Sequence, residues 1–498
     1  MAGMRRRTRP GLVFMAALVV AAIGGTAPAR GSDRSPEVSA TGVLPGPPGS
    51  AQNHDAEPGI ARSPSGDEWV TAVGVQTDRQ DVWESTDGGR TWSWRSAPFN
   101  VVPGVRAIGG NDADIAVATA ANPVGHFNVY VAGLWVTQSL GGAPVGDISL
   151  ALSPDDGTTW IVHPLAGEVP LDDRPWLVAD GACRVDLVYH SLPTVANTVN
   201  TYDLCGPLAT VEGLTLTPLT STRYPQLAPS AAGDRPDTYV TTGFGKPIVA
   251  GGDMYIPMMD CPDLTLQQEI ARAEAADPNC PAGTDAEVYV DVGAPQVSGG
   301  APTDWQLVPV ARSGNTDVAV WPVSIATDSA GTLYMAWTDD HDSYLTSSGD
   351  GGRHWSPSAK VNPAGTTAVE PTIDAGGPGD VSVAWYGTDV AGNANDPSVM
   401  GYPGAGGAAV WQLDWAHVEA SATEAPTVDG IRVVDPDVHS GALCTHGDAC
   451  TIPDSRDLLD DFGMIRTRPT AGDSIAYTSD QPGGHYGDDR TMWVTVQL

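Results

Sequence analysis

Three stretches of the chain decide its fold: Ser85–Trp92 (STDGGRTW), Ser153–Trp160 (SPDDGTTW) and Ser348–Trp355 (SGDGGRHW). All three fit S-x-D-x-G-x-x-W. Ser and Asp side chains accept hydrogen bonds from backbone N–H groups a few residues further on, which closes a tight turn. The Gly supplies the left-handed conformation that such a turn needs, and the Trp packs where the next strand begins. The pattern therefore predicts three copies of one turn, in which the aspartates are structural: Asp87, Asp155 and Asp350.

A second, weaker repeat consists of one residue, then Pro, and an apolar residue two or three positions after it. Its copies begin at Glu57, Arg174, Tyr224, Trp321 and Glu370, with degenerate copies at Asn111 and Asp461. A short strand rich in β-branched or aromatic residues follows most copies. The starts lie roughly 50 to 60 residues apart, or nearly double that, which is typical of four-stranded blades. The sequence therefore predicts an all-β fold, a six- or seven-bladed β-propeller of four-stranded antiparallel blades, with one short helical insertion between Cys261 and Cys280.

The S-x-D-x-G-x-x-W copies resemble the Asp-box, or bacterial neuraminidase repeat, of sialidase-type β-propellers. The resemblance extends through the repeats over nearly all of the chain from residue 54 onward. It implies that each turn joins the two outer strands of a blade, away from the central axis. It also implies that ligands bind at one mouth of the central channel, where the innermost strands begin.

The residues before the repeat prolines are expected to converge at that mouth, together with their neighbours. We expect Glu57, Arg174, Arg223 and Trp321 to bind substrate. The resemblance implies a tyrosine nucleophile backed by a glutamate, with an aspartate as acid/base. The candidates are Tyr224 with Glu370 or Glu57, and Asp173 or Asp112. The chain departs from the family because it lacks an Arg-Ile-Pro signature near the first blade, and no motif fixes the three arginines that hold a sialic acid carboxylate. The alternative interpretation is that these acids and arginines form ion pairs that close the ring.

The formal net charge of −35 disfavours nucleic acid and anionic membranes as partners. The six cysteines are an even number, and their proximity suggests three disulfides: Cys183–Cys205, Cys261–Cys280 and Cys444–Cys450. No cofactor or metal is predicted. Ca²⁺ stays open as an alternative at two acidic stretches, 338–342 and 389–396, although neither has the alternating spacing of a known calcium loop.

The first residues are typical of a targeting segment. A cluster of arginines precedes the apolar run Gly11–Ile23, which is too short to span a membrane, and Ala27-Pro28-Ala29 fits a cleavage site. We therefore expect a signal peptide at 1–29, a linker at 30–53 and the propeller at 54–498. The protein is expected to be secreted and monomeric, with no later membrane span.

These observations lead to two hypotheses for function. The first is a secreted glycoside hydrolase of the exo-α-sialidase type that acts on extracellular glycans. The alternative is a non-catalytic propeller that binds glycan or protein ligands. A polysaccharide lyase is a third hypothesis, for which no motif speaks.

Overall fold

The computed structural model describes residues 38–49, 53, 55–74, 79–95, 107–138, 144–163, 172–191, 196–204, 218–223, 244–262, 264, 268, 279–294, 305–316, 323–466, 472–481 and 491–497. All of them lie in one compact unit, Pro36–Leu498. No helix in these ranges is long and apolar enough to cross a membrane.

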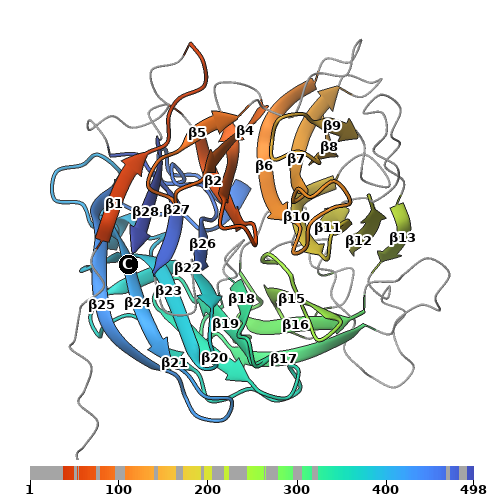
Figure 1. The fold of residues 1–498 in the computed structure, drawn as a ribbon. Coiled ribbons are helices and arrows are strands. Elements are labelled where there is room, and N and C mark those ends of the chain that lie inside the picture. Colours follow the sequence, from red (N-terminus) through yellow and green to blue (C-terminus); the bar gives the residue numbers. More distant parts are fainter. Residues whose placement is uncertain are drawn as a thin grey trace, which may run out of the picture. The chain divides into compact units, whose positions relative to one another are not determined.

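The described strands form seven antiparallel sheets of four strands each, arranged as the blades of a propeller (Figure 1). This confirms the predicted fold. The sheets are β2–β5 (Asp55–Arg62, Glu68–Gly74, Arg79–Ser85, Ser93–Arg95), β6–β9 (Ala107–Val117, Val129–Gln138, Pro144–Ser153, Ile161–His163), β10–β13 (Asp172–Asp180, Arg184–Ser191, Ala196–Asp203, Pro218–Arg223), β14–β17 (Ile248–Ala250, Asp253–Asp260, Glu287–Gly293, Gln306–Arg312), β18–β21 (Val323–Thr327, Leu333–Thr338, Ser343–Ser348, Ala359–Lys360), β22–β25 (Thr367–Ala375, Asp380–Thr388, Val410–Glu419, Thr427–Ser440) and β26–β28 (Gly463–Arg466, Asp473–Ser479, Thr491–Gln497) with β1 (Val38–Val43).

The seventh sheet contains strands from both ends of the unit, because β1 pairs antiparallel with β28. Part of the segment that we expected to be a linker is therefore a strand, and that prediction was wrong for Val38–Val43. The physical reason is that β28 would otherwise present an unpaired edge. Leu44, directly after β1, is fully buried in one core cluster with Trp83 and Val494.

The second strands of the sheets show why these segments form blades. In β19 every residue is buried. Leu333, Met335 and Trp337 pack in a core cluster with residues of the β14–β17 sheet, whereas Tyr334 and Ala336 pack in one with residues of the β22–β25 sheet. Because successive side chains of a strand point to opposite faces, each blade contributes apolar residues to the seams on both of its sides.

The S-x-D-x-G-x-x-W segments form the predicted turns. They connect β4 to β5, β8 to β9 and β20 to β21, the two outer strands of each sheet. In the first, Gly89 donates its N–H to Ser85 Oγ over 2.9 Å, and Thr91 donates its N–H to Asp87 Oδ1 over 2.8 Å. The equivalent bonds recur in the other two copies. The glycine φ angles of 78°, 72° and 80° are left-handed in all three, at Gly89, Gly157 and Gly352.

Two of the expected disulfides are present, Cys261–Cys280 and Cys444–Cys450. Cys205 lies outside the described residues, so Cys183–Cys205 stays a prediction. Most of the helical insertion expected between Cys261 and Cys280 also lies outside them. The described short helices are α2 (Pro397–Met400) and the 3₁₀ turn Gly447–Ala449.

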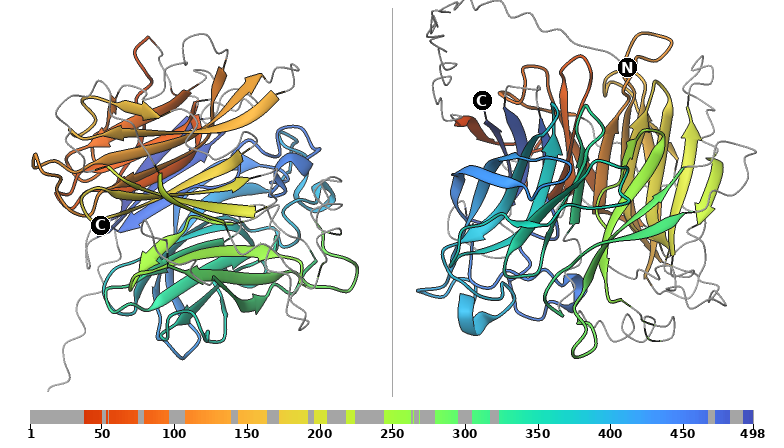
Figure 2. Two further views of the ribbon diagram at one scale, coloured as in Figure 1. Left: turned by 90° about the vertical axis from the view of Figure 1, so that its right-hand side faces the viewer. Right: turned by 90° about the horizontal axis from the view of Figure 1, so that it is seen from below.

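The connections that contain these disulfides lie at one edge of the ring. Neighbouring strands of each sheet are antiparallel, so the chain direction alternates from strand to strand. The second and fourth strands therefore end at the same edge of the sheet at which the first strand begins. The β25–β26 connection, with Cys444–Cys450, and the β23–β24 connection, with α2, therefore lie at the edge where the innermost strands begin, and so do Cys261 and Cys280, next to the ends of β15 and β16. We call this edge the mouth. Figure 2 shows the ring of sheets from two further sides.

Candidate functional site

The residues before the repeat prolines have an unusual backbone. Glu57, Arg174 and Glu370 have φ of 51°, 47° and 51°, in the left-handed region. The strand register shifts at each of them, as in a β-bulge. This conformation costs non-glycine residues about 1–2 kcal/mol, and a residue before proline normally prefers extended backbone. Bulges re-aim side chains, so the repeat places three strained residues with redirected side chains at the mouth.

Arg174 lies at the centre of this site. Its Nη1 is 3.0 Å from Glu57 Oε2 and 3.5 Å from Asp112 Oδ1, and its Nη2 is 2.5 Å from Asp461 Oδ2. The guanidinium also lies 4.5 Å from the centre of the Trp176 ring. Burial alone would lower the pKa of Arg174, but the three carboxylates raise it well above its usual value. The side chain is 2% exposed, so its charge is compensated within the protein.

Glu57 links Arg174 to the segment that precedes β26. Its Oε1 accepts the backbone N–H of Asp460 over 3.1 Å. Asp460 is in turn held by Arg456, whose Nε is 2.9 Å from Asp460 Oδ1. Burial raises the pKa of Glu57 well above its usual value, opposed by Arg174.

Asp173 and Asp112 are neighbouring acids at the mouth. Asp173 is partly exposed, and its Oδ1 accepts the N–H of Arg174 over 3.0 Å. Burial and the nearby Asp112 carboxylate raise the pKa of Asp173 well above its usual value. Asp112, with a 20% exposed side chain, is held by Arg174. The site therefore combines a carboxyl whose pKa is raised with carboxylates paired to a guanidinium.

Glu370 is a buried acid with no compensating contact in the part of the chain that the structure describes. Neither Oε1 nor Oε2 has a hydrogen-bond partner among the residues that the structure describes, and the residue is 6% exposed. Burial raises the pKa of Glu370 well above its usual value, and Asp460, Asp461, Glu57 and Asp340 raise it further. Asp461 Oδ1 likewise lacks a partner in the described part of the chain.

A cavity of about 220 Å³ runs along the axis next to this cluster. Its lining comes from the innermost strands of all seven sheets or from the residues directly before them. Glu370, Asp461 and Trp176 line it together with Asp114 and Lys246. Lys246 Nζ is 2.7 Å from Asp114 Oδ1 and 3.0 Å from the Ile115 carbonyl oxygen.

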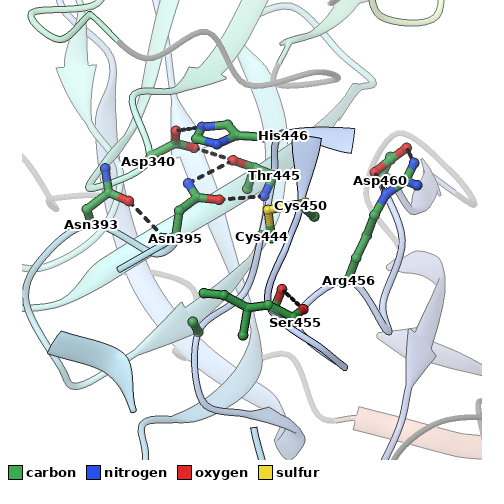
Figure 3. The surroundings of a disulfide bond; sticks show 12 residues. Asp340, Asn393, Asn395, Cys444, Thr445, His446, Cys450, Ser455, Arg456 and Asp460 are labelled. Carbon is green, nitrogen blue, oxygen red and sulfur yellow. Dashed lines mark hydrogen bonds and ion pairs between the residues drawn. A yellow bond between two sulfur atoms is a disulfide. The ribbon is translucent and has the colours of Figure 1, made fainter. Parts of the chain in front are cut away.

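The disulfide segment Leu443–Phe462 is fixed to the β19–β20 turn (Figure 3). Thr445 Oγ1 donates to Asp340 Oδ1 over 2.7 Å, and His446 Nε2 is 3.2 Å from Asp340 Oδ2. Asn395 exchanges two hydrogen bonds with Thr445. This segment, which we call the disulfide loop, contains Arg456, Asp460 and Asp461 and so supplies part of the mouth.

Asp340 belongs to the stretch 338–342, where Ca²⁺ was left open. Its carboxylate accepts the contacts of the disulfide loop, while Asp339 Oδ1 accepts the N–H of Asp342 over 2.7 Å. Within the described ranges, no group of three or more His, Cys, Asp or Glu side chains is placed to hold a metal ion.

The structure brings five of the predicted site residues together: Glu57, Asp112, Asp173, Arg174 and Glu370. Tyr224, Trp321 and the side chain of Arg223 lie outside the described residues, so their roles stay predictions. Sequence reasoning missed Asp460, Asp114 and Lys246. The acidic residue directly before the degenerate copy at Asp461 was a signal for Asp460, whereas no motif marked Lys246.

No protein-family model and no curated protein matches the chain. Solved structures similar to it include an ulvan lyase (10% identity, TM-score 0.44, covering 92% of each chain). An α-L-arabinanase of Penicillium chrysogenum has 14% identity and a TM-score of 0.41, covering 70% of this chain and 94% of that one. NanB sialidase of Streptococcus pneumoniae has 9% identity and a TM-score of 0.37, covering 91% and 70%. At this level of similarity, function has to be argued from the residues of the site.

Proposed function

We propose that the mouth is the active site of a glycoside hydrolase that cleaves glycans by acid/base catalysis between carboxyl groups. The observation that supports this most directly is that Arg174 contacts both acids: its N–H donates to Asp173 Oδ1, and its Nη2 is 2.5 Å from Asp461 Oδ2. Glycoside hydrolases commonly need one carboxyl that is protonated at the working pH and one that is ionised. Environments that push the pKa values of neighbouring acids apart provide this division of roles.

In this proposal Asp173 is the acid. Asp173 is partly exposed, so it can reach a bound substrate. Desolvation and the neighbouring Asp112 carboxylate raise its pKa, which favours the protonated form that an acid needs. Asp173 donates that proton to the glycosidic oxygen, and the leaving sugar departs as an alcohol. At the end of the cycle Asp173 regains a proton from solvent, and the base returns to solvent the proton that it took from the attacking water.

Asp461 is the proposed base. Arg174 holds its Oδ2 at 2.5 Å and opposes the rise that burial causes in its pKa, and 21% of its side chain is exposed. Asp461 accepts a proton from water while the water oxygen bonds to the anomeric carbon. Asp173 lies in β10, whereas Asp461 lies in the connection that precedes β26, and Arg174 contacts both of them.

The described residues favour a substrate without a carboxylate over sialic acid. Arg174 already contacts three acids, and its charge is not free for a sialic acid carboxylate. The raised pKa of Glu370 disfavours the ionised form that would accept a proton from a tyrosine nucleophile. An exo-sialidase would rest on Arg223 and Tyr224, whose side chains lie outside the described residues.

The experiment is hydrolysis of a panel of fluorogenic glycosides, neutral, amino and sialic, by the purified chain. We expect release from at least one non-anionic glycoside, and a loss of roughly 10²-fold or more for Asp173→Asn, the scale of general acid catalysis. Asp180→Asn is the matched control, because Asp180 is an exposed aspartate at the other end of the same strand, β10. Equal rates for Asp173→Asn and Asp180→Asn would contradict the proposal.

A non-catalytic binding propeller is the second candidate. The observation that favours it is the burial of Arg174 among three acids, an arrangement that also suits ion pairs closing the ring. Binding of glycans without release of fluorophore from any member of the panel would support this candidate.

A further inference from the structure

We propose that the axial cavity beside Glu370 binds a primary ammonium group, and that the ligand is an amino sugar. The claim that an amino sugar is the substrate rests on the proposed function. The claim that the cavity binds an ammonium group does not depend on it.

The cavity wall has unsatisfied acceptors. Three carboxyl oxygens there lack a hydrogen-bond partner among the described residues: Glu370 Oε1, Glu370 Oε2 and Asp461 Oδ1. Buried polar groups are nearly always paired, and those that are not need an explanation. A primary ammonium has three N–H donors and no acceptor, so it matches this set in number and in polarity.

The charges around Glu370 also favour a cation. The ionisable groups that face it are Asp460, Asp461, Glu57 and Asp340, with Tyr386 on the adjacent strand. Arg174 and Arg456 lie nearby, but their contacts are with other acids. Lys246, the lysine in the lining, is 2.7 Å from Asp114. An added positive charge would allow Glu370 to ionise, since an opposite charge within a few ångströms favours the charged form.

The size and the remaining wall limit the ligand to a small molecule. A volume of about 220 Å³ is below the roughly 300–1,000 Å³ of pockets for drug-sized ligands. Trp176, Pro58, Pro371 and Phe462 supply apolar surface against which a sugar ring can pack. The cavity therefore fits one sugar unit rather than a stretch of glycan.

The test is a calorimetric or NMR titration of the full chain with three sugars that share one ring size: glucosamine, glucose and glucuronate. We expect glucosamine to bind more tightly than glucose by roughly tenfold or more, the effect of charge-assisted hydrogen bonds, and glucuronate to bind most weakly. Binding of glucosamine should weaken as the pH falls, because protonated Glu370 cannot pair with an ammonium. Methylammonium should compete with glucosamine.

Glu370→Gln should remove the preference for glucosamine over glucose. Glu419→Gln should keep it, because Glu419 is an exposed glutamate at the end of β24 in the same sheet. If Glu370→Gln does not fold, Asp461→Asn provides the second variant. Equal affinities for the three sugars, tighter binding of glucuronate, or an unchanged preference in the folded variant would overturn the inference.

Binding and hydrolysis give separate outcomes. Selective binding of glucosamine without hydrolysis of any glycoside would support the inference and reject the proposed hydrolase. Hydrolysis of neutral glycosides without selectivity for the amine would do the reverse.

Discussion

Asp460 donates its backbone N–H to Glu57 Oε1 across 403 positions of the sequence, over 3.1 Å. The same carboxylate contacts Arg174 through Oε2. One glutamate therefore connects the first, third and last sheets at the mouth.

Replacing Glu57 separates the effect of its side chain from that of its strained backbone. Glu57→Ala should lower the free energy of unfolding, though by less than the roughly 3–5 kcal/mol lost when a buried ion pair is broken outright, because Asp112 and Asp461 still contact Arg174. Glu57→Gly should be about 1 kcal/mol less destabilising than Glu57→Ala, since the φ of 51° favours glycine. Urea denaturation measures both. The same midpoint for the two variants would show that the left-handed backbone is not strained.

The turns between the outer strands should affect stability without affecting the site. Asp87 accepts hydrogen bonds from the Thr91 N–H and hydroxyl, at 2.8 and 2.7 Å. Asp87→Ala removes them and should cost about 1–2 kcal/mol of stability. Glycoside turnover and sugar affinity should stay at wild-type values. A selective loss of turnover in a fully folded Asp87→Ala protein would contradict the structural role of this aspartate.

His439 should make stability depend on pH. It is fully buried, with Nδ1 2.5 Å from Asp480 Oδ2 and Nε2 3.2 Å from the Ala442 carbonyl oxygen. Burial alone would lower the pKa of His439, but the bond to Asp480 raises it above its usual value. A raised folded pKa stabilises the protein fully below the unfolded value of about 6.5, and this stabilisation is lost as the pH rises through the folded pKa.

The measurement is the thermal midpoint across neutral and alkaline pH. The wild type should lose stability over that range, and His439→Gln should be less stable at low pH but lose less on going to high pH. His341→Gln is the control. Parallel curves for wild type and His439→Gln would refute the assignment.

The two disulfides should differ in their effects on the free energy of unfolding and on local hydrogen exchange. Removing Cys444–Cys450 should cost about 2 kcal/mol and removing Cys261–Cys280 about 3 kcal/mol, from loop separations of 6 and 19 residues. The first change should also speed amide hydrogen exchange in the disulfide loop, which supplies Arg456 and Asp460 to the mouth. The second should leave exchange there unchanged. Faster exchange of the disulfide loop in both variants would mean that the loop's order depends on global stability alone.

Gly245 should tolerate no side chain. A Cβ added at Gly245 would lie 1.8 Å from the Val323 carbonyl oxygen, and both residues line the axial cavity. Gly245→Ala should therefore destabilise the protein by about 1–3 kcal/mol, as other overpacked sites do, and weaken sugar binding. Gly406→Ala is the control for the side-chain volume, because nothing lies within 4 Å of a Cβ there and its φ is not left-handed. Near-identical melting for Gly245→Ala and wild type would count against this packing.

Much of the fold could be predicted because it is repeated. The turns at Asp87, Asp155 and Asp350 and the strands after the repeat prolines are local patterns, and hydrogen bonding within a few residues determines them. Strand Val38–Val43 was missed because its partner is β28, almost the whole chain away, and its own six residues contain no distinctive pattern.

The site was predicted in part for a related reason. Equivalent positions in a ring converge, so Glu57, Arg174 and Glu370 could be identified from their place before a proline. A sequence repeat does not predict side-chain geometry. It could therefore not predict which acid contacts Arg174, or that Glu370 has no partner in the described chain. Lys246 and Asp114 were missed because their pairing joins two different sheets.

The pairing of β1 with β28 has a consequence for how preparations of this protein can be judged. Arg174, Glu57 and Asp461 meet only when the first and last sheets are side by side, so a chain that has folded most of its blades but not joined its ends has no mouth. Spectroscopic measures of β-structure would score such a molecule as nearly native. The stoichiometry of sugar binding would be reduced in such a preparation. It therefore measures the fraction of molecules whose ring is complete.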